Sequence, residues 1–337
     1  MKKRKLLIVA TVIIITCIVV IIALGKSQET STLRIGYSSQ SLNYSSVMVA
    51  EEAGFFKEHG ADVELVPFAS GTHTRLALST GNIDAAFLNV ADFLVAIGAG
   101  APVKIIAPIA QTTTLVFVRP NDGIETFEDL RGKKILGQVN TSRYNLIHAL
   151  AQEGITDPDL TFLDIDSEYR TVALMQQKVF DAVPTSRHNE SSWIKAGAVI
   201  LREWDEKGYS NKFNPHMYIG VNTDYFPENK AQVERALDAI VDAQKYILHD
   251  PQVAAELVRN HIDVATDGIS DLTIPYILNT WTVGTRGIVW SDPQEVVEIA
   301  NFLYTLGELK NSLSIDQIFD FQFREKLERY QETFYNE

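Results

Sequence analysis

Residues 49–88 read VAEEAGFFKEHGADVELVPFASGTHTRLALSTGNIDAAFL, and a later segment of the chain repeats the order of helices and strands that this sequence predicts. Its apolar pattern predicts a helix that stops at Gly60, a strand, a second helix, and a strand that opens at Asp84. Residues 146–185, LIHALAQEGITDPDLTFLDIDSEYRTVALMQQKVFDAVPT, follow the same order, with the stop at Gly154 and the last strand at Asp181. Gly60 and Gly154 are 94 residues apart and Asp84 and Asp181 are 97 apart, so the copies stay nearly in register. Two similar β-α-β-α-β halves predict two similar lobes, each a mostly parallel sheet flanked by helices.

Two apolar segments flank the second half and predict where the chain crosses between the lobes. TLVFVRP, residues 114–120, leads into that half, and HMYIGV, residues 216–221, leads out of it. We therefore expect lobe I to comprise residues 32–113 with 222–337, lobe II to comprise residues 121–215, and the two segments to form hinge strands. The later helices carry apolar stripes and are expected to pack against lobe I.

The N-terminus predicts an extracytoplasmic protein. Four basic residues, Lys2 to Lys5, precede an uncharged apolar run of 19 residues from Leu6 to Leu24. That run is long enough to span a bilayer, and the basic cluster should stay in the cytoplasm. Ala23-Leu24-Gly25 is also a passable cleavage site. Residues 1–25 are thus a membrane anchor or a signal, followed by a polar tether over 26–31. The remaining chain is anchored to the outer face of the cytoplasmic membrane or secreted to the periplasm or cell surface.

Composition excludes several classes of function. The net charge is −13, and −17 without the four N-terminal basic residues, so nucleic acid and anionic lipid are poor partners. The single cysteine, Cys17, lies in the apolar run, which leaves the exported part without a disulfide, a catalytic thiol or a cysteine metal ligand. The histidines show no metal-binding spacing, and no Gly-rich nucleotide loop precedes a helix. We expect no catalytic residue, no metal and no cofactor.

Several segments together carry a resemblance to a known family. They are VAEEAGFFKEHGADVELVPFASG, ALSTGNIDAAFLNV, IGAGAPVKIIAPI, GIETFEDLRGKKIL and LMQQKVFDAV, in this order between residues 33 and 221. The chain resembles the nitrate/sulfonate/taurine and thiamine-pyrimidine-precursor group of ABC transporter solute-binding proteins. The resemblance implies a two-lobed type II periplasmic-binding-protein fold, preceded here by the N-terminal hydrophobic helix. It also implies a small-molecule ligand held between the lobes, an ABC permease with its ATPase as partners, and a monomer.

Physical reasoning places a ligand site in the same region. In open α/β sheets ligands bind beyond the carboxyl ends of strands, where loops lead into helix N-termini that favour anions. The polar loop residues at such positions are also preferred helix caps, which is the plainer interpretation of each one alone. Asp84 and Asp181 are expected to stabilise turns and are left out. The candidate ligand-binding residues are Gln40, Asn43, Tyr44, Ser70, Thr72, Asn89, Asp92, Thr113, Thr141, Ser142, Thr185 and Arg187.

One departure from the family concerns the ligand. Many relatives carry an aromatic and an acid shortly after the second Asp-Ala pair, whereas this chain has Pro184-Thr185-Ser186-Arg187-His188. Loss of the acid and gain of Arg187 favour an anionic group on the ligand, because guanidinium pairs with carboxylate, sulfonate or phosphate. A surface Arg is the alternative. The candidate ligands are an alkyl sulfonate or taurine, a nitrate-like oxyanion, and a thiamine pyrimidine precursor.

Two other functions stay open at this point. Pyrimidine-precursor synthases resemble the same group, but they carry a cysteine-rich run that this chain lacks. An extracellular sensor needs a second membrane crossing or an effector, whereas the sequence closes on the polar FREKLERYQETFYNE. We therefore expect a binding protein.

Overall fold

The computed structural model describes most of the chain from residue 31 onward. The described residues are 31–39, 42–137, 141–156, 160–163, 171–187, 190–211, 214–259, 261, 273–275, 277–278, 281 and 292–334. The expected N-terminal helix over residues 1–25 lies outside them. Within these ranges no helix combines the length and the apolar character needed to cross a membrane. Residues Leu33–Glu337 form one compact unit.

The first sheet has five strands in the order β2-β1-β3-β10-β4. Strands β1, β2 and β3 are parallel to one another, whereas β10 is antiparallel to both β3 and β4. The strands span Leu33–Ser38 (β1), Val63–Phe68 (β2), Ala85–Asn89 (β3), Val103–Thr112 (β4) and Asn214–Asn222 (β10). The second apolar crossing segment is therefore a strand of the first sheet.

The second sheet repeats this arrangement with the order β7-β6-β8-β5-β9. Strands β6, β7 and β8 are parallel, and β5 is antiparallel to β8 and β9. The strands span Thr114–Val118 (β5), Lys134–Leu136 (β6), Thr161–Leu163 (β7), Ala182–Ser186 (β8) and Val199–Ile200 (β9). The predicted duplication is confirmed, because each half contributes three parallel strands and an antiparallel neighbour.

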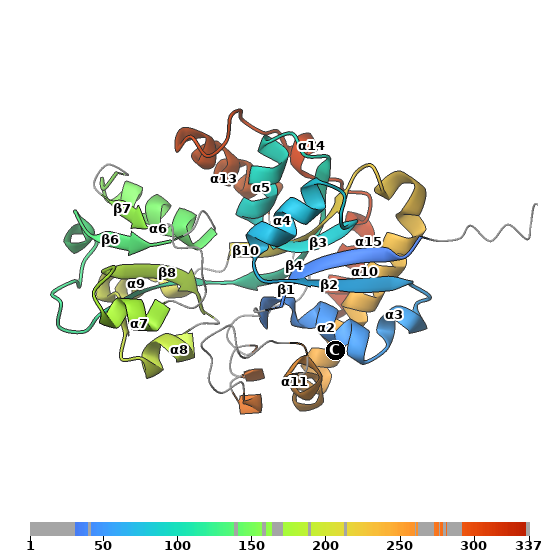
Figure 1. The fold of residues 1–337 in the computed structure, drawn as a ribbon, viewed down its shortest axis with the longest axis horizontal. Coiled ribbons are helices and arrows are strands. Elements are labelled where there is room, and N and C mark those ends of the chain that lie inside the picture. Colours follow the sequence, from blue (N-terminus) through green and yellow to red (C-terminus); the bar gives the residue numbers. More distant parts are fainter. Residues whose placement is uncertain are drawn as a thin grey trace, which may run out of the picture. The chain divides into compact units, whose positions relative to one another are not determined.

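Helices cover both faces of each sheet (Figure 1). Those of the first sheet are α2 (Ser45–Glu52), α3 (Phe55–Glu58), α4 (Gly71–Ser79), α5 (Val90–Gly98), α10 (Phe226–His249), α11 (Pro251–Arg259), α13 (Pro293–Thr305), α14 (Ile315–Ile318) and α15 (Arg324–Phe334). Those of the second sheet are α6 (Thr141–Gln152), α7 (Thr171–Gln176), α8 (Glu190–Lys195) and α9 (Arg202–Glu206). Short 3-10 turns span Leu42–Tyr44, Glu128–Leu130 and Tyr209–Asn211.

The alternation of strand side chains divides each sheet's apolar residues between two cores. In β3, Phe87 points into a core with α2 and α10, whereas Leu88 packs with α4, α5 and α13 on the other face. In β5, Val116 packs with α6 and Phe117 with α8 in the same way. The apolar stripes that the sequence predicts on α10 and α13 are the faces that these helices bury against the first sheet.

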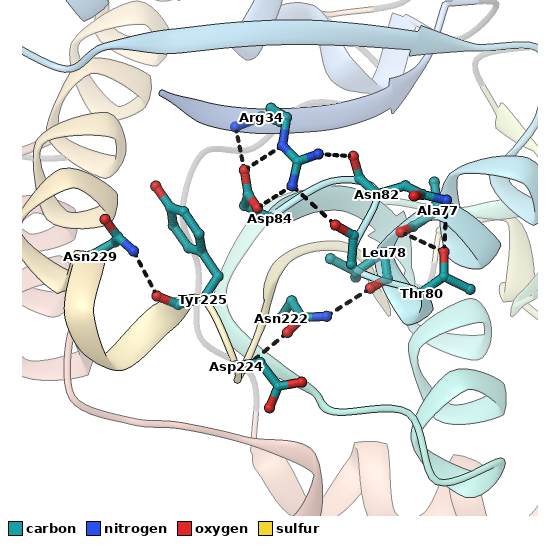
Figure 2. Close-up of polar contacts among 11 residues, drawn as sticks. Arg34, Ala77, Leu78, Thr80, Asn82, Asp84, Asn222, Asp224, Tyr225 and Asn229 are labelled. Atoms are coloured by element: carbon teal, nitrogen blue, oxygen red, sulfur yellow. Dashed lines mark hydrogen bonds and ion pairs between the residues drawn. The ribbon is translucent and has the colours of Figure 1, made fainter. Parts of the chain in front are cut away.

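An Asp opens the third strand of each half and makes the same pair of backbone bonds. Asp84 N–H donates to Arg34 O at 2.9 Å, and its Oδ2 accepts from Arg34 N–H at 2.9 Å. Asp181 N–H donates to Lys134 O at 2.7 Å, and its Oδ2 accepts from Lys134 N–H at 2.9 Å. A guanidinium completes each clamp, from Arg34 on Asp84 (Figure 2) and from Arg119 on Asp181. Both Asp residues therefore tie neighbouring strands together at their amino ends, whereas the sequence led us to expect that they stabilise turns.

Candidate ligand site

The topology brings the carboxyl ends of the strands of both sheets toward one crossing point. In the first sheet β1, β2 and β3 end at Ser38, Phe68 and Asn89, and because they are parallel these ends share one edge, here called the first edge. In the second sheet β8 ends at Ser186, which pairs with Thr114 at the start of β5. This is the second edge. Strand β4 ends at Thr112 and β5 begins at Thr114, so the single residue between them joins the two edges.

At the first edge two of the candidates are helix caps. Ser70 caps α4, where its Oγ accepts from His73 N–H at 3.4 Å and lies 2.8 Å from His73 Nδ1. Asn89 caps α5, where its Oδ1 accepts from Asp92 N–H at 3.0 Å. Thr72 lies half-buried in the first turn of α4. Ser70 and Asn89 thus have structural roles, and these roles hold the two helix N-termini at this edge.

A buried carboxylate lies between these two helices. Asp92 is 8% exposed, its Oδ1 lies 3.3 Å from Arg75 Nε, and its Oδ2 accepts from the amide of Asn89. Burial raises the pKa of Asp92 to about 6, against the opposing influence of Arg75 and Asn89. A Cβ at Gly71 would stand 2.9 Å from Asp92 Oδ2, so Gly permits this close approach. A carboxylate here favours hydrogen-bond donors or cations over a second anion.

The loop after β1 is fixed by a residue that sequence reasoning missed. Trp281 Nε1 donates to Ser45 Oγ at 3.0 Å, and Ser45 Oγ donates to Leu42 O at 2.6 Å. Both side chains are buried. Tyr44 is 4% exposed, and its ring packs edge-on against those of Tyr37 and Phe87. Trp281 lies 236 residues from Ser45, and no local pattern links them.

Two other candidate residues, Asn43 and Gln40, lie near this loop in the sequence. Asn43 is half-buried within the 3-10 turn that precedes α2. Gln40 lies outside the described residues.

At the second edge Thr113 and Arg187 are held together. Arg187 N–H donates to Thr113 O at 2.8 Å, which continues the pairing of β5 with β8. The Thr113 hydroxyl is fully buried, 3.4 Å from the carbonyl oxygens of Tyr209 and Ser210. The Arg187 guanidinium donates to Ser210 O and lies 3.4 Å from Glu190 Oε2. Glu190 therefore neutralises part of the positive charge of Arg187, which we expected from the sequence to pair with an anionic ligand.

The N-terminus of α6 carries a buried hydroxyl cluster. Thr141 is 1% exposed and Ser142 is 5% exposed. Thr114 Oγ1 accepts from Asn145 Nδ2 at 2.8 Å and lies 3.5 Å from Ser142 Oγ. Thr141 Oγ1, by contrast, is buried with no hydrogen-bond partner among the residues that the structure describes. A buried unpaired hydroxyl is costly, so a polar partner supplied from outside the chain would satisfy it.

Thr185 is the last of the candidate residues. Thr185 is half-buried in β8, opposite Leu115 of β5. Among the described residues no cluster of three or more His, Cys, Asp or Glu side chains is arranged to hold a metal ion.

Comparison with known proteins identifies the family. The family model described as NMT1/THI5 like matches residues 41–254, more than half of the chain. The chain belongs to the NMT1/THI5-like family. The matched region runs from the loop after β1 to α11 and so includes eleven of the twelve candidate site residues, all but Gln40. The resemblance noted in the sequence is confirmed at this level.

Relatives of this NMT1/THI5-like protein include binding proteins. The chain is 32% identical over 322 residues to YtlA of Bacillus subtilis strain 168, which is named as a binding protein, covering 91% of this chain and 93% of that one. It is 27% identical over 231 residues to a protein of Escherichia coli strain K12 named as an aliphatic sulfonates-binding protein, covering 66% and 68%.

A solved structure shares the fold. The alkanesulfonate-binding protein SsuA of Xanthomonas axonopodis pv. citri, bound to MOPS, superposes with a TM-score of 0.70 at 18% identity, covering 87% of this chain and 99% of that one. The two-sheet α/β architecture of this NMT1/THI5-like protein is thus that of a periplasmic binding protein.

Proposed function

We propose that this protein captures a small solute with an anionic group between the two edges and delivers it to the permease of an ABC importer. Lobe I comprises residues 32–113 with 222–337, lobe II comprises residues 121–215, and 114–120 with 216–221 are the hinge strands. The relatives that carry names of binding proteins support capture rather than catalysis. The residue that joins the edges, Thr113, supports a site reached from both sheets.

The observation that carries the proposal is the unpaired hydroxyl of Thr141. Its Oγ1 is buried without a partner in the described part of the chain, at the N-terminus of a helix of 12 residues. Backbone N–H groups in the first turn of a helix have no intrahelical acceptor and carry partial positive charge. An oxyanion placed there accepts from the Thr141 hydroxyl and from these N–H groups together. Ser142 is the next residue of α6, and Arg187 directly follows β8 at the second edge.

The ligand class that the observations favour is a sulfonate. The names of the Escherichia coli relative and of the Xanthomonas SsuA structure both refer to sulfonates. A sulfonate has three acceptor oxygens, which suits hydroxyl and backbone donors at the second edge. At the first edge Asp92 is an acceptor, which favours a ligand whose other end donates hydrogen bonds, as the ammonium of taurine does. Nitrate-like oxyanions and thiamine pyrimidine precursors are the alternatives.

The localisation is part of the proposal. The basic residues at 2–5 and the apolar run at 6–24 support a location outside the cytoplasm, with residues 1–25 as an anchor or signal. Protease added to intact cells should digest the part of the chain after Lys26. Protection until lysis contradicts this topology.

A thermal-shift panel tests the function. The ligands are ethanesulfonate, MOPS, taurine, nitrate and an aminopyrimidine, with ethanesulfonamide as the neutral match to ethanesulfonate. A ligand at 100 times its dissociation constant adds about 2.7 kcal/mol to stability, which raises the melting temperature by several degrees. We expect a shift from at least one sulfonate and none from the sulfonamide. Equal shifts from both, or none from any anion, contradict an anion site.

Two arginine variants assign the anion to the second edge. Arg187→Ala should weaken the anion that binds by about 1.5 to 3 kcal/mol, the range for hydrogen bonds to charged groups. Arg202→Ala is the matched control, because this Arg lies 57% exposed on α9 and pairs with Glu125. If both variants bind as tightly as the parent, Arg187 does not contact the ligand and Glu190 alone accounts for its charge.

A further inference from the structure

Helices α6 and α13 contact each other, although they belong to different sheets. Tyr144 of α6 meets Phe302 of α13 edge-on, with ring centroids 5.0 Å apart and planes at 76°. Tyr144 also stacks on His148, one turn along α6, at 5.6 Å. His148 in turn lies edge-on to Phe302 at 6.5 Å. Three rings therefore join one helix of each sheet at a place separate from the crossing strands.

The two faces of α6 explain how it bridges the sheets. Leu146, Ala149 and Leu150 point into the second sheet's core with Ile135. Tyr144 and His148 lie on another face of α6, and the Tyr144 ring packs against the core of the first sheet. Side chains of one helix thus take part in the packing of both sheets.

The partner surface on α13 is anchored to the first sheet. Four α13 residues, Val296, Ile299, Ala300 and Leu303, are buried with β4 and α5. The turn after α13 packs closely against the end of α5, because a Cβ at Gly98 would stand 2.8 Å from the Leu309 side chain. Phe302 is therefore presented by an element that moves with the first sheet.

Polar groups around the rings add to the contact. Burial raises the pKa of the Tyr144 hydroxyl to about 12, with smaller contributions to this value from the nearby Glu298 and Glu295 carboxylates. Arg143 Nη2 lies 3.9 Å from Glu308 Oε1, and the same guanidinium lies 4.2 Å from the Phe162 ring centroid. The contact therefore partly shields the phenol from water and spans the sheets with an ion pair as well as rings.

We propose that the contact of Tyr144 with Phe302 is a latch that holds the two sheets in the binding arrangement before ligand arrives, so that Tyr144 sets affinity without touching ligand. Thr141 and Ser142 lie within one turn of Tyr144, so the latch fixes the α6 N-terminus relative to the first sheet. Apparent affinity is reduced in proportion to the fraction of protein in the competent arrangement. This affinity consequence rests on the proposed function, whereas the latch itself does not.

The latch is tested without ligand. In the full chain with Cys17→Ser, spin labels at Leu248→Cys on α10 and Ile194→Cys on α8 report the distance between the sheets. Both positions are exposed, at 53% and 52%. We expect Phe302→Ala to move the distance distribution away from that of the parent. Tyr304→Ala is the matched control, because this residue lies on the same helix and is 47% exposed. Identical distributions for Phe302→Ala and the parent overturn the latch.

A second variant and a ligand titration complete the test. Tyr144→Ala should shift the distances in the same direction, and a circular dichroism melt of each variant checks that it is folded. In calorimetry with MOPS we expect Phe302→Ala to raise the dissociation constant two- to tenfold and Tyr304→Ala to leave it unchanged. Binding that weakens while the distances stay fixed overturns the latch. If MOPS does not bind the parent, the titration uses the sulfonate that gives the largest thermal shift, and if no sulfonate binds, the ligand proposal fails while the label distances still decide the latch.

Discussion

Replacing Thr141 by Val should raise stability and weaken ligand binding at the same time. Thr141 Oγ1 is buried with no partner among the described residues, and a buried unsatisfied polar group costs about 1 to 3 kcal/mol. Val keeps the branched shape without the hydroxyl. We therefore expect the free energy of unfolding in urea to rise by about 1 kcal/mol. Loss of a hydrogen bond to a charged ligand costs about 1.5 to 3 kcal/mol, so the dissociation constant should rise about 10- to 100-fold.

Thr114→Val is the matched control for this prediction. Its hydroxyl accepts from Asn145 Nδ2 at 2.8 Å and lies 3.5 Å from Ser142 Oγ. Removing it leaves a buried donor unpaired, so stability should fall by about 1 to 3 kcal/mol. Urea unfolding measures stability, and calorimetry with the ligand from the thermal-shift panel measures affinity. The reasoning is refuted if Thr141→Val destabilises as much as Thr114→Val, or if it binds ligand as tightly as the parent.

Three further predictions follow from contacts elsewhere in the protein. Trp281→Phe should lower stability by about 1 kcal/mol and weaken ligand binding, and Ser45→Ala should cost less in that background than in the wild type, because both remove the Trp281–Ser45 hydrogen bond while only Ser45→Ala removes the bond to Leu42 O; full additivity in urea unfolding argues against it. Folding raises the pKa of Asp92 from 3.8 to about 6, so its contribution to stability is present below about pH 4 and lost as pH rises through 6. Relative to Asp92→Asn, the wild type should lose on the order of 2 to 3 kcal/mol between pH 4 and 7, whereas a constant difference contradicts the shift. Asp84→Asn should reduce stability by about 2 kcal/mol while ligand affinity stays unchanged, and altered affinity would place Asp84 in the site.

The parts of the fold that the sequence predicted are those with a local or repeated signal. Helix stops at Gly60 and Gly154 have positive φ, as a residue past a helix end requires. The spacing of Asp84 and Asp181 predicted two equivalent halves, and the identical backbone clamps explain why those residues recur. The segment 216–221 was expected to be a hinge strand, but its pairing with β3 and β4 lies beyond what hydropathy can assign.

The candidate site was predictable only in its location. Parallel strands bring their carboxyl ends to one edge of the sheet. The strand topology alone therefore places the loops that contain Ser70 and Asn89 at that edge. Whether a polar residue there is already satisfied depends on contacts between distant segments. Arg187 contacts Glu190 and the carbonyl of Ser210, whereas Thr141 Oγ1 has no hydrogen-bond partner within the described ranges. The role of each of the twelve residues toward ligand stays a prediction.

The central claim is that ligand lies between the two edges with its anion at the N-terminus of α6. A crystal structure of the protein in complex with the sulfonate that gives the largest thermal shift tests this most directly. We expect sulfonate oxygens within about 3 Å of Thr141 Oγ1 and of the first-turn N–H groups of α6, and we expect the other end of the ligand to point toward Asn89 and Asp92. A ligand bound away from α6, or one that leaves Thr141 Oγ1 unpaired, would contradict it.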